Sequence, residues 1–159
     1  MNKPARAPLE ELASAWEAAW MGSGYFSRCC TPDVHYEDPA VNEPLRGLED
    51  LEDAAAALRS AFPDLRVERA TPAFGDGRQA CIPWRALGNH TGAIGTLPET
   101  DKFVVLTGIH YVEIEDDRVR RARGFWDLYD ATTQMGLLPQ RGSLGETALL
   151  MLRGFGLRR

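Results

Sequence analysis

The stretch "GIHYVEIEDDRVRRARGFWD", residues 108–127, decides the fold class of this chain. It joins two extended segments, 102–115 and 118–129, across the pair Asp116-Asp117. Alternation of apolar and polar residues is typical of half-buried strands, and a pair of turn residues between two such runs indicates a hairpin. The stretch therefore predicts two long antiparallel strands in the last third of the chain.

Two further extended segments precede this hairpin, at roughly 65–73 and 79–93, and Gly75-Asp76-Gly77 provides the turn between them. Upstream, the sequence predicts helices at "PLEELASAWEAAWMGSG" and "GLEDLEDAAAALRSAFPDL", a short helix at "YFSRCC" and a short strand at "DVHYEDP". Helices followed by a run of antiparallel strands predict an α+β fold. We expect a cone-shaped curved antiparallel sheet with the N-terminal helices packed inside its concave face, an α+β barrel.

Length and composition narrow the function classes. A chain of 159 residues fits one domain, 1–159, with a core at about 8–140 and a C-terminal tail at 141–159. The net charge of -5 provides no basic field for nucleic acid, and no 18-residue apolar run indicates a membrane span. Three cysteines give no disulfide framework, and three histidines include no pair at zinc-ligand spacing. We therefore expect a cytoplasmic protein without metal, cofactor, nucleic-acid partner or membrane anchor.

Alternation along the strands predicts which side chains face the inside of the cone. The more apolar face of the first hairpin strand carries His110, and the preceding strand places His90 and Trp84 on one face. In the last strand, strict alternation cannot place both Trp126 and Asp127 inside, although a β-bulge would allow it. These side chains are therefore candidates for a site in the cone.

Each polar candidate also has a structural role open to it. Asp127 would cap the following turn or pair with Arg123, and His90 or His110 would be a core histidine. Asp38 directly precedes a proline and is most simply a turn residue. Burying a carboxylate is costly unless it is paired, so Asp127 is either exposed at the rim or held in a pocket.

Three stretches resemble, in order, the SnoaL-like polyketide cyclases of the ketosteroid isomerase/nuclear transport factor 2-like superfamily. They are "DVHYEDPAVNEPLRG", "ALGNHTGAIGTLPETDK" and "GIHYVEIEDDRVRRARGFWD". In addition, Asp127 precedes Gln134 by seven positions, and "QMG" stands where the family has Q-L-G. The resemblance spans roughly residues 10–139. It implies that Asp127 is the catalytic acid/base and that His90 lines the pocket beside it.

The isomerase branch offers a second comparison. "VHYEDPAVNEP" resembles the isomerase segment that carries the general-base aspartate, which matches Asp38. "HYVEI" resembles the strand of the oxyanion-hole acid, but His110 stands in its place, and Trp16 stands where that branch has a tyrosine. The resemblance therefore does not reproduce the isomerase donors.

We expect a cofactor-free cyclase or isomerase of a hydrophobic, polyketide- or steroid-like carbonyl substrate. In this hypothesis Asp127 abstracts an acidic proton α to a carbonyl and returns it, while His90 stabilises the enolate oxygen. The substrate-binding residues would be Asp38, Trp84, His110, Trp126 and Trp16.

Two alternatives remain open. One is an epoxide hydrolase of the same fold, with an Asp-Arg-Asp relay to which Arg85 or Arg123 contributes beside Asp127. The other is a small-molecule binding module without catalysis, since this architecture hosts many functions.

The outer strand face and the tail predict associations. Phe103, Val105, Ile109 and Tyr111 would form an apolar stripe, so we expect a homodimer through the outer sheet face. In the tail, a helix from about Ala148, interrupted by Gly154 and Gly156, is expected to pack on the domain or fray rather than to bind a membrane.

Overall fold

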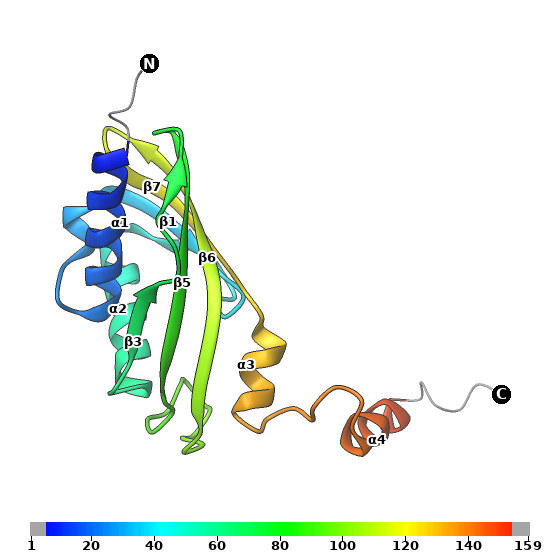
Figure 1. Ribbon diagram of the computed structural model, residues 1–159. Coiled ribbons are helices and arrows are strands. Elements are labelled where there is room, and N and C mark those ends of the chain that lie inside the picture. The colour runs from blue at the N-terminus through cyan, green and yellow to red at the C-terminus, as the bar shows by residue number, and fades with distance from the viewer. Residues whose placement is uncertain (1–5, 154–159) are drawn as a thin grey trace.

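A curved, seven-stranded sheet forms the wall of the fold, and two long helices pack on its concave face (Figure 1). This computed structural model describes residues 6–153. In chain order the elements are α1 (Arg6–Met21), the 3-10 helix η1 (Phe26–Arg28), β1 (Cys30–Glu37), β2 (Leu45–Arg46), α2 (Gly47–Ala61), β3 (Arg66–Arg69), β4 (Phe74–Gly75), β5 (Gln79–Asn89), β6 (Phe103–Glu115), β7 (Arg118–Trp126), α3 (Leu128–Gln134) and α4 (Leu144–Leu152). The α+β fold expected from the sequence is confirmed.

The strand order is β2-β1-β7-β6-β5-β3, and β4 also pairs with β5. The pairs β5–β6 and β6–β7 are antiparallel, as the hairpin patterns predicted. The pair β1–β7 is parallel, and helix α2 and five other strands, β2 to β6, separate the two partners in the sequence. The sheet is thus antiparallel except at this junction, which local patterns could not reveal.

The β6–β7 turn follows directly from the sequence. Asp116 and Asp117 both have left-handed φ angles, +49° and +60°. A two-residue turn with two positive φ angles matches the twist of the strands it joins, and aspartate tolerates this region better than most residues.

A β-bulge at Arg120 sets the register of β7. Glu113 pairs with Arg121, whereas the next residue, Ile114, pairs with Val119, so Arg120 is an extra residue on β7. Val119 and Ala122 are both fully buried for this reason. A bulge near Trp126 would have allowed the following aspartate to face inside, but the bulge lies six residues earlier, and β7 ends at Trp126.

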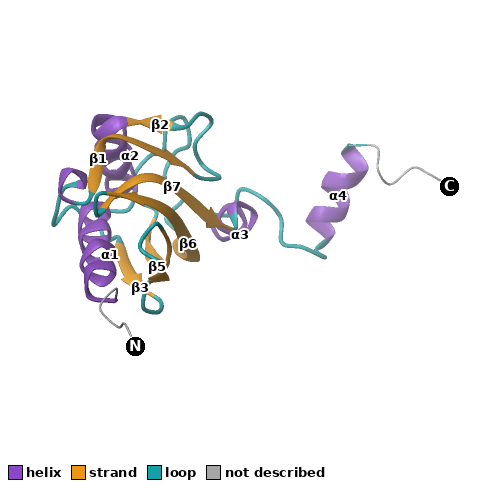
Figure 2. Cartoon of the chain, turned by 90° about the horizontal axis from the view of Figure 1, so that it is seen from above, coloured by secondary structure: helices purple, strands orange, loops and turns teal. Residues whose placement is uncertain are grey.

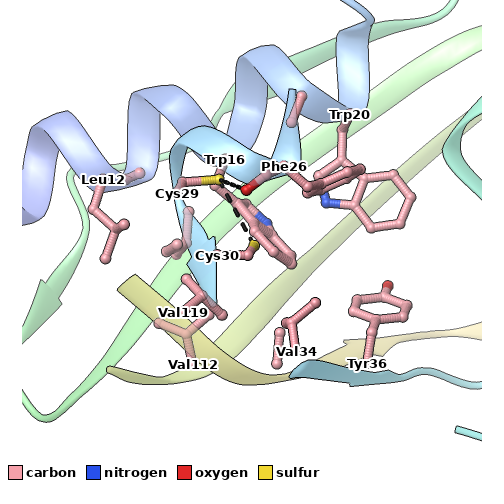
Figure 3. Close-up of a cluster of buried hydrophobic side chains, with 14 of the residues drawn as sticks. Leu12, Trp16, Trp20, Phe26, Cys29, Cys30, Val34, Tyr36, Val112 and Val119 are labelled. Carbon is pink, nitrogen blue, oxygen red and sulfur yellow. Dashed lines mark hydrogen bonds between the residues drawn. The ribbon is translucent and has the colours of Figure 1, made fainter. Parts of the chain in front are cut away.

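Aromatic side chains from α1 fill the cone (Figure 3). Trp16 and Trp20 are one helical turn apart and face Tyr36 of β1, while Phe26 of η1 packs against both indoles. Trp16 is 1% exposed and Phe26 is fully buried. The helical spacing of the tryptophans therefore places two large rings on the same face of α1, one turn apart.

Helix α3 was not predicted, and it covers an open strand edge. Strand β7 stops opposite Gly108, which leaves the earlier part of β6 without a neighbour on that side. The Gln134 side chain fills the gap: its Oε1 accepts from Val105 N at 2.8 Å, and its Nε2 donates to Val105 O at 2.8 Å. A glutamine amide thus replaces one residue of a neighbouring strand.

The tail differs from its expectation. Helix α4 begins at Leu144 rather than near Ala148, lies away from the sheet (Figure 2), and has no buried residue. Gly154 and Gly156 lie outside the described residues. Among residues 6–153, no helix combines the length and the apolar composition needed to cross a bilayer.

We predict that Gln134→Ala lowers the free energy of unfolding by about 1–3 kcal/mol, because the backbone N–H and C=O of Val105 lose their partners. Urea unfolding measures the change. The matched control is Gln140→Ala, which removes the same side chain from an exposed position. Equal losses in the two variants would contradict the edge-covering role of Gln134.

Candidate functional site

His110 lies at the centre of an aromatic cage. Its ring stacks between Trp20 and Trp84, with centroid distances of 5.9 and 5.5 Å and interplanar angles of 3° and 29°. Trp16 meets it edge-on at 5.4 Å, and Tyr36 lies 5.9 Å away. Helix α1 and strands β1, β5 and β6 all contribute, so the cage exists only in the assembled fold.

A chain of hydrogen bonds with one direction runs through this cage. The Trp16 indole N–H, which can only donate, donates to His110 Nδ1 at 3.1 Å. The hydroxyl of Tyr36 donates to Asp38 Oδ2 at 2.7 Å, so its oxygen is free to accept from His110 Nε2 at 3.4 Å. His110 is therefore the tautomer with the proton on Nε2, and the chain ends on the Asp38 carboxylate.

The surroundings keep both the His110 imidazole and the Tyr36 phenol in their neutral forms. Burial lowers the pKa of His110 from 6.5 to about 3. Burial, and then the neighbouring Asp38 charge, raise the pKa of Tyr36 well above its usual value of 10. A neutral imidazole and a protonated phenol are thus fixed as donors that point toward Asp38.

Asp38 is half-buried just after β1 and is held from both sides. Its Oδ1 accepts from the backbone N–H groups of Ala40 and Val41 at 2.7 and 3.2 Å, so the turn role expected from the sequence is present. Gly124 makes the close approach possible, since a Cβ at this position would lie 2.9 Å from Asp38 Cβ and 3.0 Å from Tyr36 Oη.

Trp84 lies flat on the strand beside it because Gly108 has no side chain. A Cβ at Gly108 would come within 2.5 Å of the Trp84 ring. The indole nitrogens of Trp84 and Trp20 are both buried and have no hydrogen-bond partner among the described residues. Two unsatisfied N–H donors therefore flank His110, which is unusual because buried polar groups are normally paired.

Asp127 has the structural role that was left open for it. It is exposed and precedes α3 as its N-cap, with Oδ1 accepting from Asp130 N at 2.9 Å. The expectation that Asp127 faces the cone beside His90 is wrong, because β7 ends before it and its carboxylate satisfies the start of a helix. Trp126, the last strand residue, is half-buried opposite Gly108.

His90 is fully buried, but at the other end of the sheet. Its Nδ1 lies 2.9 Å from Thr100 Oγ1, and its ring lies 5.1 Å from that of Phe62. Ile82 is the residue opposite His110, so His90 is eight residues, roughly 26 Å, further along β5. The two histidines thus belong to separate sites, and a catalytic role for His90 stays a prediction.

The Asp-Arg-Asp relay of an epoxide hydrolase is not assembled from the expected residues. Arg85 is exposed, and Arg123 pairs with Glu37 at 3.2 Å on the surface. Among the described residues, no three His, Cys, Asp or Glu side chains are close enough together to hold a metal ion.

Two open grooves of about 230 and 250 Å³ lie away from the cage, near the β6–β7 turn. Both contain Glu113 and Arg120. Glu113 faces away from His110, because three positions separate them on β6. Charged side chains of both signs line these grooves, whereas small-molecule sites are mostly apolar. We therefore place the candidate site at the aromatic cage, where the hydrogen bonds converge.

The structure therefore unites Asp38, His110, Trp16 and Trp84 from the sequence-based set and separates Asp127 and His90 from it. Tyr36 and Trp20 were missed as site residues. Trp20 follows Trp16 at helical spacing, and Tyr36 alternates with Val34 on β1; both patterns were usable signs that these residues face inward.

A sequence model of the SnoaL-like polyketide cyclase family matches residues 10–135. Similar solved structures include a protein assigned to the SnoaL-like polyketide cyclases from Jannaschia sp. CCS1, 19% identical, with a TM-score of 0.75 and coverage of 88% of this chain and 99% of that chain. TsrD from Streptomyces laurentii is 24% identical, with a TM-score of 0.73 and coverage of 84% and 98%.

A protein of ketosteroid isomerase-like fold from Catenulispora acidiphila DSM 44928, solved with trimethylamine, is 19% identical, with a TM-score of 0.66 and coverage of 80% and 93%. At these identities the structures establish a shared fold. No curated protein matches the chain.

We predict that His110 makes stability depend on pH between 6.5 and about 3. In this range His110 is protonated in the unfolded chain but not in the folded protein. The free energy of unfolding therefore falls as the pH falls, by up to about 1.4 kcal/mol per pH unit. Urea unfolding at pH 7 and pH 5 measures the slope, and His110→Gln should reduce it. An identical slope in both proteins would show that a neutral buried imidazole is not responsible.

Proposed function

This chain belongs to the SnoaL-like polyketide cyclase family, and on that premise we propose that it is an acid/base cyclase or isomerase whose proton-transferring group is Asp38. The observation that carries the proposal is the chain of hydrogen bonds from Trp16 through His110 and Tyr36 to the Asp38 carboxylate. This arrangement orients one carboxylate at the edge of an aromatic cage.

Asp38 would take a proton from a carbon α to a carbonyl, and the electron pair of that C–H bond would move to the carbonyl oxygen as an enolate. For a cyclisation, the enolate carbon would then attack a second carbonyl of the same substrate: a C–C bond forms, the C=O π bond breaks to give an alkoxide, and Asp38 returns its proton to that oxygen. For an isomerisation, Asp38 would return the proton at another carbon. Tyr36 and His110 hold the carboxylate in place and are positioning residues in this scheme.

The enolate oxygen needs a donor that is already in place. The unpaired indole N–H groups of Trp20 and Trp84 offer two, on either side of His110. Trp84 is the better candidate, because its side chain is half-buried on β5 whereas Trp20 is only 7% exposed, but the Trp84 Nε1 is itself buried, so a bound substrate would have to displace the packing that covers it. A fixed donor of this kind stabilises negative charge that develops in the transition state.

The same surroundings suggest a substrate class. The groups that surround the carboxylate are a phenol, an uncharged imidazole and indole rings, which favour flat, neutral, oxygenated rings over phosphorylated or strongly anionic molecules. We therefore propose a hydrophobic polyketide- or steroid-like carbonyl compound as substrate, with no cofactor.

Exchange of α-protons in D2O, followed by proton NMR on a panel of aromatic β-diketones and steroid-type cyclic ketones, tests the proton transfer. We expect the protein to accelerate exchange and Asp38→Asn to reduce the rate by roughly 100-fold or more.

The matched control is Asp127→Asn, since asparagine caps a helix about as well as aspartate and the fold is preserved. A loss of activity in Asp127→Asn with full activity in Asp38→Asn would refute our assignment and restore the sequence-based one. Binding of these ketones without any acceleration of exchange would favour a binding module.

We also predict that Trp84→Phe lowers the exchange rate by roughly 100-fold, because it keeps an aromatic ring but removes the donor to the enolate. Trp126→Phe removes an indole N–H at the end of β7, which β6 separates from β5, and should change the rate little. Similar rates for Trp84→Phe and the unmodified protein would exclude Trp84 as the donor.

A further inference from the structure

Helix α4 is an apolar helix without a partner. Its exposed side chains include Leu149 at 40%, Leu150 at 47%, Met151 at 56% and Leu152 at 86%, and none of its residues is buried. A nine-residue helix is too short to be stable in water on its own propensity and normally depends on tertiary packing. We therefore expect another surface to cover the apolar side chains of α4.

The helix nevertheless begins with well-formed capping interactions. The hydroxyl of Ser143 accepts from Glu146 N at 3.2 Å, and Glu146 in turn accepts from Gly142 N at 2.5 Å. The first contact is that of an N-cap serine, and the second resembles the return contact of a capping box but comes from the residue before the cap. The segment is thus built as a helix, not as an unstructured end.

The connection to α3 directs α4 away from its own domain (Figures 1 and 2). Tyr129 of α3 holds this connection twice: its hydroxyl donates to Pro139 O at 2.8 Å, and its ring lies 4.6 Å below the guanidinium of Arg141. These contacts hold residues 139–141 against α3, so α4 starts away from its own sheet and leaves its apolar side chains accessible to a surface on another molecule.

The outer sheet face of the same chain is an apolar surface that also lacks a cover. Phe103 is 54% exposed and Phe125 is 48% exposed, and Phe125 lies opposite Ile109, which is half-buried on β6. Val105 adds a further half-buried side chain on the same face of β6. Aromatic and aliphatic side chains therefore recur on this face, with Thr107 between Val105 and Ile109.

Charge favours contact between tail and domain. Residues 140–159 contain four arginines and one glutamate, a net charge of +3, whereas the rest of the chain has 14 Lys and Arg against 22 Asp and Glu, a net charge of -8. An acidic domain attracts a basic tail from another copy, and its net charge opposes docking on an anionic lipid surface.

We propose that α4 is an arm that docks on the outer sheet face of a second copy of this chain, with the two copies exchanging arms about a two-fold axis. Exchange of an identical element closes a dimer without a new type of surface, since each copy supplies both the arm and the patch. The apolar side of α4 would lie over Phe103, Val105 and Phe125 of the other copy. This inference does not depend on the proposed function.

Sedimentation equilibrium of the full chain tests the association. We expect twice the monomer mass of 17.6 kDa. The double variant Leu149→Ser with Leu152→Ser changes two residues one helical turn apart, and it should raise the dimer dissociation constant by roughly tenfold or more. The control Phe74→Ser removes another exposed apolar side chain, 60% exposed on β4, and should leave the constant unchanged.

Photo-crosslinking locates the arm and does not require a destabilised variant. A benzoylphenylalanine at position 149, in an equal mixture of 15N-labelled and unlabelled chains, should join peptides of α4 to peptides of β6 or β7 that carry the other isotope label. Crosslinks only within one chain would overturn the proposal in favour of a folded-back tail. A monomer of 17.6 kDa, or co-sedimentation with phosphatidylcholine–phosphatidylserine vesicles that needs Leu149 and Leu152, would overturn it as well.

Discussion

The packing of this protein depends on a buried imidazole that must remain uncharged. His110 is surrounded by three indoles and a phenol, and its burial lowers its pKa to about 3. The Trp16 indole fixes the tautomer, because an N–H donor needs a bare Nδ1. Because a charge at this position would be costly, the groups that contact His110 are uncharged. The one carboxylate in the series of hydrogen bonds, that of Asp38, is at its outer end.

The position of that carboxylate separates two hypotheses that look alike in the sequence. Both Asp38 and Asp127 follow directly after a strand, and both accept backbone N–H groups of the next turn. Only Asp38 also accepts from a buried hydroxyl, that of Tyr36. The hydrogen bond from Tyr36 joins Asp38 to the series of hydrogen bonds through the cage. Asp127 has no such bond and is a helix cap at the surface.

Two glycines and one glutamine allow close contacts that other side chains would prevent or leave unmade. Gly124 and Gly108 lie on neighbouring strands and admit Asp38 and Trp84 to positions that a Cβ would block. Gln134 closes the open edge of β6 where β7 has already ended, so α3 stays attached to the sheet. Beyond α3, Tyr129 sets the direction in which the chain leaves the domain.

The sequence by itself determined the elements whose causes are local. The sequence predicted the helix that carries Trp16 and Trp20, alternation placed His110 on the inner face of β6, and the aspartate pair at 116–117 specified the turn. The family resemblance also pointed to Asp38 as well as to Asp127. Only the tertiary structure could choose between them, because the choice depends on the bulge at Arg120, the end of β7 and the parallel pairing of β1 with β7. Each of these joins residues far apart in the chain, and periodicity within one strand contains no information about its neighbour.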